Sequence, residues 1–255
     1  MKEQLNYSEK AYRDMCWDCL RPLISCFCKS LKSFQTHARF VFLMHPKEAK
    51  KNKTGTGRIS HLCLENSEIL MGIHFRENKR FQQLLSDPQY IPFVLYPGAN
   101  SFRVDQSEIP QNLLLGHNKR PLIFIIDGTW PCAKKMMVVN PELQTLPRLS
   151  FSSSQTSAFK IKHQPNSSCL STIESVFYFL KAWKEGGYFE PSGEKDHQIL
   201  LTGLEKIVNF QIKCALDPKL KSYRKSEYKS PEMRKDSIKW KKRRLFYEKE
   251  NFNNL

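Results

Sequence analysis

Three short apolar runs, each ending directly before a proline or a glycine, stand out along the chain. They cover residues 39–45 (RFVFLMH), 91–97 (IPFVLYP) and 121–127 (PLIFIID). Runs that are apolar at consecutive positions and rich in Phe, Ile and Val are typical of strands buried on both faces of a parallel sheet. The pattern therefore predicts three strands of one parallel sheet.

Helical patterns alternate with these runs. Residues 60–64 and 75–85 have helical character, and a helix begins near Pro131, where the missing N–H of proline costs little. Ser171 and Glu174 match a capping box, which opens an amphipathic helix that runs to the Gly-Gly pair at residues 186–187. A last helix covers roughly residues 196–216. This alternation of strand and helix indicates an α/β domain.

We expect three parts along the chain. Residues 1–32 form a polar lead and a four-cysteine knuckle, residues 33–217 form the α/β domain, and residues 218–255 form a basic tail that contains aromatic residues. The sequence contains no internal repeat. Ligands of such a domain bind beyond the carboxyl ends of the parallel strands, so the loops that follow the three runs are where a site is expected.

The net charge of the chain indicates what kind of partner it binds. The chain has 41 Lys and Arg against 25 Asp and Glu, a formal charge of +16, which exceeds what solubility asks of a domain of this size. A polyanion is the expected partner. The tail supplies much of the excess, since residues 219–249 hold thirteen Lys or Arg and four Asp or Glu, a local charge of +9. Its interleaved aromatic residues favour an arm that follows phosphates and stacks on bases, while a solvated tail or a nuclear-localisation signal stays open as an alternative.

Nothing in the sequence indicates a membrane protein. The 40% of hydrophobic residues can fill an ordinary core, but no stretch approaches 18 consecutive apolar residues, and the first residues lack the apolar run of a secretory signal. We expect a soluble, cytoplasmic protein with no membrane partner; the sequence leaves its oligomeric state open.

Half of the eight cysteines lie within thirteen residues. Cys16, Cys19, Cys26 and Cys28 have the spacing C-x2-C-x6-C-x-C. Four thiolates at such spacing suit a closed, structural Zn²⁺ site, and an iron–sulfur cluster is the main rival. A zinc ion with four cysteine ligands has no open position for a substrate, so the site is expected to organise the N-terminal part. The flanking cations Arg21, Lys29 and Lys32 are candidates for contact with RNA.

The most informative strand-end loop is residues 127–131 (DGTWP). It offers a carboxylate, a flexible glycine, a hydroxyl and an aromatic face between a buried strand and a helix start. A capped turn with Trp130 in the core explains the same residues. Conventional nucleotide motifs are missing, because no P-loop occurs and the G-x-G-x-x-S at residues 55–60 does not follow a strand.

Several blocks together resemble the DTW-domain family. The cysteines are followed by HPKE at 45–48, LYP at 95–97, L-x4-DGTW-x2-A at 122–133, SAF at 157–159 and LST-x-E at 170–174. These blocks run in this order over about residues 14–214, and DGTW together with the four-cysteine knuckle is a specific combination. The resemblance implies a SPOUT-like fold, a knotted parallel sheet whose deep C-terminal knot is an exception to the rule that chains are unknotted.

The resemblance also implies an activity, that of a tRNA-uridine aminocarboxypropyltransferase. Such an enzyme moves the 3-amino-3-carboxypropyl group of S-adenosylmethionine to N3 of a uridine, with tRNA as the partner. Asp127, Thr129 and Trp130 are the implied catalytic residues, and Asp127 is either the general base or the carboxylate that orients the cofactor. The cofactor-binding residues are expected in three loops: Leu95, Tyr96, Pro97, Gly98, Asp127, Gly128, Thr129, Trp130, Leu170, Ser171 and Thr172.

Two features qualify this expectation. Where the family commonly has Asn-Thr-Gly-Arg this chain has GTGR at residues 55–58, so the hydrogen bonds of the Asn are lost or supplied elsewhere. The helix N-terminus at Ser171 suits the cofactor carboxylate, but Glu174 would compete for the same N–H groups. The open alternatives are a knotted RNA methyltransferase, an enzyme acting on rRNA, and a zinc-containing RNA-binding protein without catalysis.

Overall fold

A computed structural model describes residues 14–50, 55–110, 113, 119–152, 157–159 and 169–216. Within these residues a parallel sheet has the strand order β2-β1-β5-β3-β6-β4. Its strands are β1 (Arg39–Met44), β2 (Ser67–Met71), β3 (Tyr90–Leu95), β4 (Ser101–Arg103), β5 (Arg120–Asp127) and β6 (Arg148–Ser150). The α/β class and the three predicted parallel strands are confirmed, with β5 between β1 and β3.

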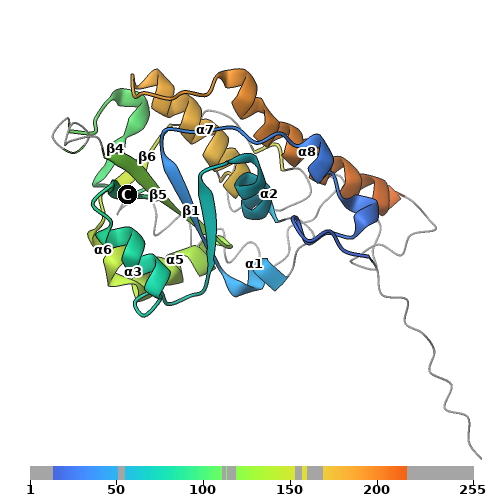
Figure 1. The fold of residues 1–255 in the computed structure, drawn as a ribbon, viewed down its shortest axis with the longest axis horizontal. Helices are drawn as coiled ribbons and strands as arrows, with labels where there is room; N and C mark the ends of the chain where they lie inside the picture. Colours follow the sequence, from blue (N-terminus) through green and yellow to red (C-terminus); the bar gives the residue numbers. More distant parts are fainter. Residues whose placement is uncertain are drawn as a thin grey trace, which may run out of the picture.

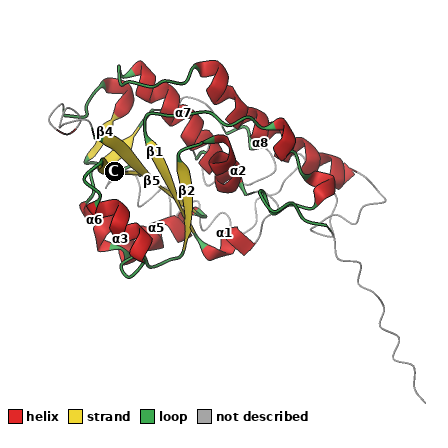
Figure 2. Ribbon diagram, in the orientation of Figure 1, coloured by secondary structure: helices red, strands yellow, loops and turns green. Residues whose placement is uncertain are grey.

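Helices cover both faces of this sheet (Figures 1 and 2). They are α1 (Pro46–Lys50), α2 (Thr56–Cys63), α3 (Lys79–Ser86), α5 (Trp130–Val139), α6 (Pro141–Thr145), α7 (Thr172–Glu185) and α8 (Glu194–Leu216), with 3-10 turns η1 (Leu23–Ser25), η2 (Cys28–Ser30) and η4 (Val104–Gln106). The helices α2, α7 and α8 lie against one face, and α3, α5 and α6 lie against the other.

Two hydrophobic clusters explain the consecutive apolar residues of the strands. In β1, Phe40 and Phe42 pack into the cluster under α2, α7 and α8, while Val41 and Leu43 pack into the cluster under α3, α5 and α6. All four side chains have no exposed surface. Side chains alternate between the two faces of a strand, so a strand covered on both faces is apolar at every position.

The predicted helices are present, but two of them start elsewhere than predicted: α2 begins at Thr56, four residues before the predicted start at residue 60, and α3 begins later than predicted. Residues 75–78 do not belong to α3, because Asn78 caps that helix by accepting a hydrogen bond of 2.9 Å from the Phe81 N–H. Phe75 instead donates its N–H to the Asn140 side chain at 2.7 Å. The capping box at Ser171 is present and opens α7, which ends before Gly187 in a left-handed conformation with a φ of +80°.

The sequence patterns did not reveal three strands. β2 lies at one edge of the sheet with a half-buried face, and β4 and β6 have only three residues each. Neither length nor alternation distinguishes such segments from loops. The described residues do not test the knot that the resemblance implies, and the predicted basic tail, residues 218–255, lies outside them. No helix among the described residues is long and apolar enough to cross a membrane.

Candidate active site

A cavity of about 270 Å³ opens where three parallel strands end. The ends of β3, β5 and β6 form its floor, with Leu95, Ile125 and Leu149. The starts of α5 and α7 supply the walls. The full lining is Leu95, Tyr96, Pro97, Ile125, Ile126, Gly128, Trp130, Ala133, Leu149, Ser150, Phe151, Leu170, Thr172 and Ser175. The site therefore lies beyond the carboxyl ends of the strands, as the parallel sheet predicts.

The turn after β5 is compact. A methyl group added at Gly128 would lie 3.3 Å from the Cys132 Cβ and 3.5 Å from the His45 Cβ, so only a small residue fits without adjustment. The exposed Thr129 is the N-cap of α5 and accepts the Ala133 N–H at 2.8 Å. This tight turn brings Trp130, in the first turn of α5, to the wall of the cavity.

Asp127 is buried next to this cavity and does not line it. The Thr172 hydroxyl donates a hydrogen bond of 2.6 Å to its Oδ1, and a methyl group added at Gly57 would come within 2.5 Å of its Cγ. The carboxylate therefore lies between the first turns of α2 and α7. Thr172 itself lines the cavity, so one hydroxyl connects the buried carboxylate to the site.

The start of α7 is fixed by a second buried carboxylate. Glu174 accepts the Ser171 N–H at 2.8 Å and the Ser171 hydroxyl at 2.6 Å. The same carboxylate accepts the Ala158 N–H at 2.6 Å and the Ser157 hydroxyl at 2.8 Å. Glu174 thus joins two sequence blocks that are far apart in the chain, and the N–H of Ser171 already has a partner.

His45 closes the end of β1 beside this turn. Its N–H donates to the Asp127 carbonyl at 2.9 Å, and its Nδ1 accepts the Lys47 N–H at 3.1 Å. Burial lowers the pKa of the imidazole, with the cation of Lys47 acting in the same direction. His45 is therefore a neutral residue whose hydrogen bonds fix the end of β1, which is a structural role.

The structure brings most of the predicted site residues together. Seven of them line the cavity: Leu95, Tyr96, Pro97, Gly128, Trp130, Leu170 and Thr172. The other four are Asp127 and Ser171, which are buried beside it, Thr129, which is the exposed N-cap, and Gly98, which lines a second cavity. Sequence reasoning missed Ser150 and Phe151, because the three-residue β6 carries no recognisable strand pattern.

The four cysteines of the N-terminal knuckle converge. Their Sγ atoms all lie within 4.8 Å of one another, with Cys16 and Cys28 3.9 Å apart and Cys19 and Cys26 3.8 Å apart. Around a tetrahedral zinc ion with Zn–S bonds of about 2.3 Å, neighbouring sulfurs lie about 3.8 Å apart. The four thiols thus lie close enough together to hold one metal ion, and all are free of disulfides.

Arg21 supports the knuckle from inside, which corrects the expectation that it contacts RNA. It has only 3% of its surface exposed, and its Nε donates to the Ser25 carbonyl at 3.1 Å. Its guanidinium lies over the rings of Phe27 and Phe210, which connects the knuckle to α8. Burial lowers the pKa of Arg21, and the neighbouring thiolates oppose that shift. Lys29 and Lys32 remain exposed.

Comparison with known proteins gives relatives for this arrangement. The chain is 32% identical over 174 residues to tRNA-uridine aminocarboxypropyltransferase 2 of Drosophila melanogaster, which covers 64% of each chain. It is 26% identical over 205 residues to the Macaca fascicularis protein of that name, covering 78% of this chain and 64% of the relative. It is also 25% identical over 222 residues to tRNA-uridine aminocarboxypropyltransferase A of Arabidopsis thaliana, covering 79% and 82%.

The chain spans less than two thirds of the length of the fly and macaque relatives. No solved structure matches it. The model of the DTW domain matches residues 13–212, a span that includes the cysteine knuckle, the cavity and Asp127. The chain belongs to the DTW-domain family.

Proposed function

We propose that this chain is a tRNA-uridine aminocarboxypropyltransferase. The observation that carries the proposal is the convergence of three family blocks on one cavity: Tyr96 and Pro97 from the first, Gly128 and Trp130 from the second, and Thr172 from the third. These blocks are far apart in sequence, and a shared ligand explains why they meet. The names of the fly, macaque and plant relatives give the reaction class.

The lining of the cavity suits S-adenosylmethionine as the co-substrate. Leu95, Ile125 and Leu149 form an apolar floor for the adenine ring, and the hydroxyls of Ser150, Thr172 and Ser175 offer polar contacts to the ribose and the amino-acid arm. The volume of about 270 Å³ is close to the lower end for small-molecule sites. When bound, this co-substrate supplies a sulfonium whose neighbouring carbons are open to nucleophilic attack.

The transfer needs orientation and the removal of one proton. Uridine N3 forms a bond to the methylene of the amino-acid arm, the carbon–sulfur bond breaks with its electron pair left on sulfur, and methylthioadenosine leaves. The walls of the cavity must hold that methylene, and not the methyl group, in line with N3. Trp130 is the proposed wall at the reacting arm, and Thr129 is the N-cap residue that precedes it at the start of α5.

Asp127 acts on the cavity through Thr172 in this proposal. Since the Thr172 hydroxyl donates its proton to Asp127, its oxygen is left as an acceptor in the cavity. That oxygen is placed to accept a hydrogen bond from the N3–H of uridine or from the ammonium of the amino-acid arm. Asp127 is the group that receives the N3 proton by this route or that orients the arm, the two roles implied by the resemblance.

The cysteine knuckle is the proposed site of a structural Zn²⁺. The distances of 3.8 and 3.9 Å between thiol sulfurs fit the edges of a tetrahedron of zinc ligands. Cys16, Cys19, Cys26 and Cys28 would hold the ion as thiolates, and the buried cation of Arg21 would balance part of their negative charge. Elemental analysis of the purified chain separates zinc from an iron–sulfur cluster.

We also propose the domain division, the knot and the cellular site of action that the sequence predicts. We retain the three-part division at residues 32 and 217, a SPOUT-like knot in the α/β domain, and action in the cytoplasm on tRNA. The basic residues of 218–255 are the proposed arm that adds affinity for RNA phosphates without reading the base sequence.

The by-product of the reaction tests this proposal. The purified chain, incubated with S-adenosylmethionine and tRNA, should release methylthioadenosine only when tRNA is present. Asp127→Ala should abolish the release, whereas Asp87→Asn, at the end of α3, should leave it intact. Formation of S-adenosylhomocysteine would instead assign a methyltransferase, and absence of both products from a folded chain would favour an RNA-binding protein without catalysis.

A further inference from the structure

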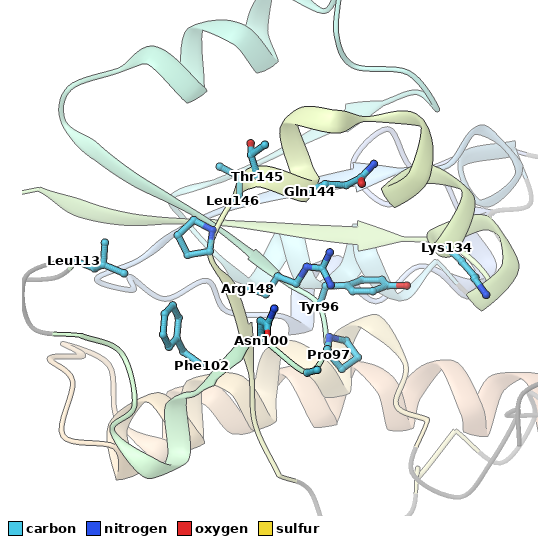
Figure 3. A pocket seen from close by; sticks show the side chains of 13 residues that line it. Tyr96, Pro97, Asn100, Phe102, Leu113, Lys134, Gln144, Thr145, Leu146 and Arg148 are labelled. Carbon is cyan, nitrogen blue, oxygen red and sulfur yellow. The ribbon is translucent and has the colours of Figure 1, made fainter. Parts of the chain in front are cut away.

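A second, larger cavity adjoins the proposed cofactor site. It has a volume of about 900 Å³ and lies between the loop that follows β3 and the segment that joins α6 to β6 (Figure 3). Tyr96 and Pro97 line both cavities, so one short segment separates them. A ligand bound in the larger cavity is therefore an immediate neighbour of whatever occupies the smaller one.

The larger cavity is positively charged. Arg148 and Lys134 line it, and the described residues of its lining include no Asp or Glu. Figure 3 shows the Arg148 guanidinium beside the Tyr96 ring, whose hydroxyl end points toward Lys134. Burial raises the pKa of Tyr96 although both cations oppose the shift, so its hydroxyl stays protonated and can donate. Two cationic side chains and a phenol that can donate thus line one cavity, a set of groups whose chemistry suits an anion.

Arg148 is held in place from two sides. Its backbone is the first residue of β6, paired with Val94 of β3, and its guanidinium carbon lies 5.9 Å from the centre of the Tyr96 ring. A methyl group added at Gly98 would come within 2.9 Å of its Nη1, so the glycine leaves room for the guanidinium. An arginine that rests on an aromatic ring presents a fixed planar fork, which matches the oxygens of a phosphate.

Carboxamide groups complete the lining. Gln144 donates its amide N–H groups to the carbonyls of Met137 and Val138, both at 3.0 Å, which leaves its oxygen as an acceptor. Asn100 adds another carboxamide, and Figure 3 places it below the Arg148 side chain. Hydrogen-bonding side chains beside an aromatic ring are the groups with which proteins bind unpaired RNA bases by hydrogen bonding and stacking. Phosphate-binding and base-binding chemistry thus occur in one cavity.

We infer that the larger cavity binds the nucleotide that adjoins the reacting uridine in the RNA, with Arg148 on its phosphate and Tyr96 between it and the cofactor site. The inference rests on the proposed function, and it identifies where the chain holds its RNA substrate next to the chemistry. Adjacent nucleotides in single-stranded RNA are one phosphate apart, and the shared Tyr96–Pro97 segment provides that adjacency. Arg148 is a substrate-positioning residue in this account.

Arg148→Gln and Arg148→Lys test the inference in the chain of 255 residues. Loss of one charge-assisted phosphate contact should weaken the binding of a tRNA transcript about tenfold and lower the salt slope of binding by about one. The lysine variant should retain the salt slope but not the full affinity, because it keeps the charge without the fork. The binding of methylthioadenosine, measured by calorimetry, should not change in either variant.

Arg80→Ala is the matched control. Arg80 is a half-exposed arginine paired with Glu68 of β2, at the opposite edge of the sheet from β6 and β4. An equal loss of RNA affinity in Arg80→Ala and Arg148→Gln would overturn the inference, because the effect would then belong to general charge. Unchanged RNA affinity in a folded Arg148→Gln would overturn it as well.

The failure of this inference differs from the failure of the proposed function. If the wild-type chain transfers the aminocarboxypropyl group and Arg148→Gln does so with an unchanged KM for tRNA, only the assignment of the cavity is wrong. If the wild-type chain binds tRNA through Arg148 but releases no methylthioadenosine, the proposed reaction is wrong while the RNA site stands. The inference expects transfer by the wild type and a raised KM for tRNA in the variant.

Discussion

The close approach of Gly57 to the Asp127 carboxylate gives a sharp prediction for stability. A methyl group added at Gly57 would lie 2.5 Å from the Cγ of Asp127, closer than real contacts allow, and 3.0 Å from its Oδ1. Asp127 is 5% exposed and accepts the Thr172 hydroxyl at 2.6 Å, so it cannot move aside without losing that bond. We therefore expect Gly57→Ala to destabilise the fold.

The magnitude follows from two contributions. Overpacking of a buried site costs about 1–3 kcal/mol, and a hydrogen bond to a charged group contributes about 1.5–3 kcal/mol. Since part of the strain is relieved when the bond breaks, we expect a loss of about 3 kcal/mol. In an ordinary helix Gly→Ala stabilises the fold by up to about 1 kcal/mol. A loss of stability in Gly57→Ala would therefore indicate the clash with Asp127.

Urea unfolding of the chain of 255 residues, followed by circular dichroism, measures this loss. Gly55→Ala at the start of the same helix is the control, because among the described residues its added methyl group would meet only the Arg58 Cβ, at 3.8 Å; the change at this N-cap should cost no more than about 1 kcal/mol. The decisive comparison repeats Gly57→Ala in an Asp127→Ala background, where the clash is gone. An equal cost of Gly57→Ala in both backgrounds would refute the account of this contact.

Four further predictions concern the site, the metal, the pH and the tail. Thr172→Val should reduce transfer strongly while Thr172→Ser retains most of it, because the hydroxyl of Thr172 connects Asp127 to the cavity; equal rates for Val and Ser, measured with labelled co-substrate, would contradict this. Cys26→Ser should lower the bound zinc measured by elemental analysis and the melting temperature together, whereas Cys214→Ser should leave the zinc content unchanged. Burial lowers the pKa of four histidines in the folded chain, namely His37, His45, His61 and His197. The free energy of unfolding should therefore be highest above the unfolded pKa of about 6.5 and should fall as the pH drops below it. A urea midpoint that does not change between about pH 7.5 and 5.5 would contradict this. A chain that ends at Pro218 should bind tRNA more weakly with a flatter salt dependence and keep its cofactor affinity; loss of cofactor binding would show that the tail belongs to the fold.

The central strands were predictable because of their burial. β1, β3 and β5 lie in the interior of the sheet, so their apolar residues form consecutive runs. β4 and β6 are three-residue segments, whose pairing depends on neighbours that the local sequence does not specify. This is why Ser150, at the end of β6, and Arg148, at its start, were not expected near a site.

The sequence patterns did not predict which face of the sheet the Asp127 side chain lies on, although the alternation of side chains along the strand determines it. Side chains alternate along β5, and Ile123 and Ile125 face the cluster under α2 and α7. Asp127 continues that face and meets Gly57 and Thr172, while the turn at Gly128 carries the chain to the cavity wall. Motif reasoning pointed to a loop that lines the cavity, but only the packing of α2 and α7 shows which groups of that loop face the cavity.

The central claim is that this chain places an aminocarboxypropyl group on N3 of a uridine, and mass spectrometry of nucleosides tests it most directly. The wild-type chain would be incubated with tRNA and S-adenosylmethionine labelled in the amino-acid arm, and the tRNA then digested to nucleosides. The account predicts a labelled uridine derivative substituted at N3, formed in equal amount with methylthioadenosine and absent with Asp127→Ala. A methylated nucleoside formed with S-adenosylhomocysteine, or tRNA without label from a folded chain that binds the co-substrate, would contradict it.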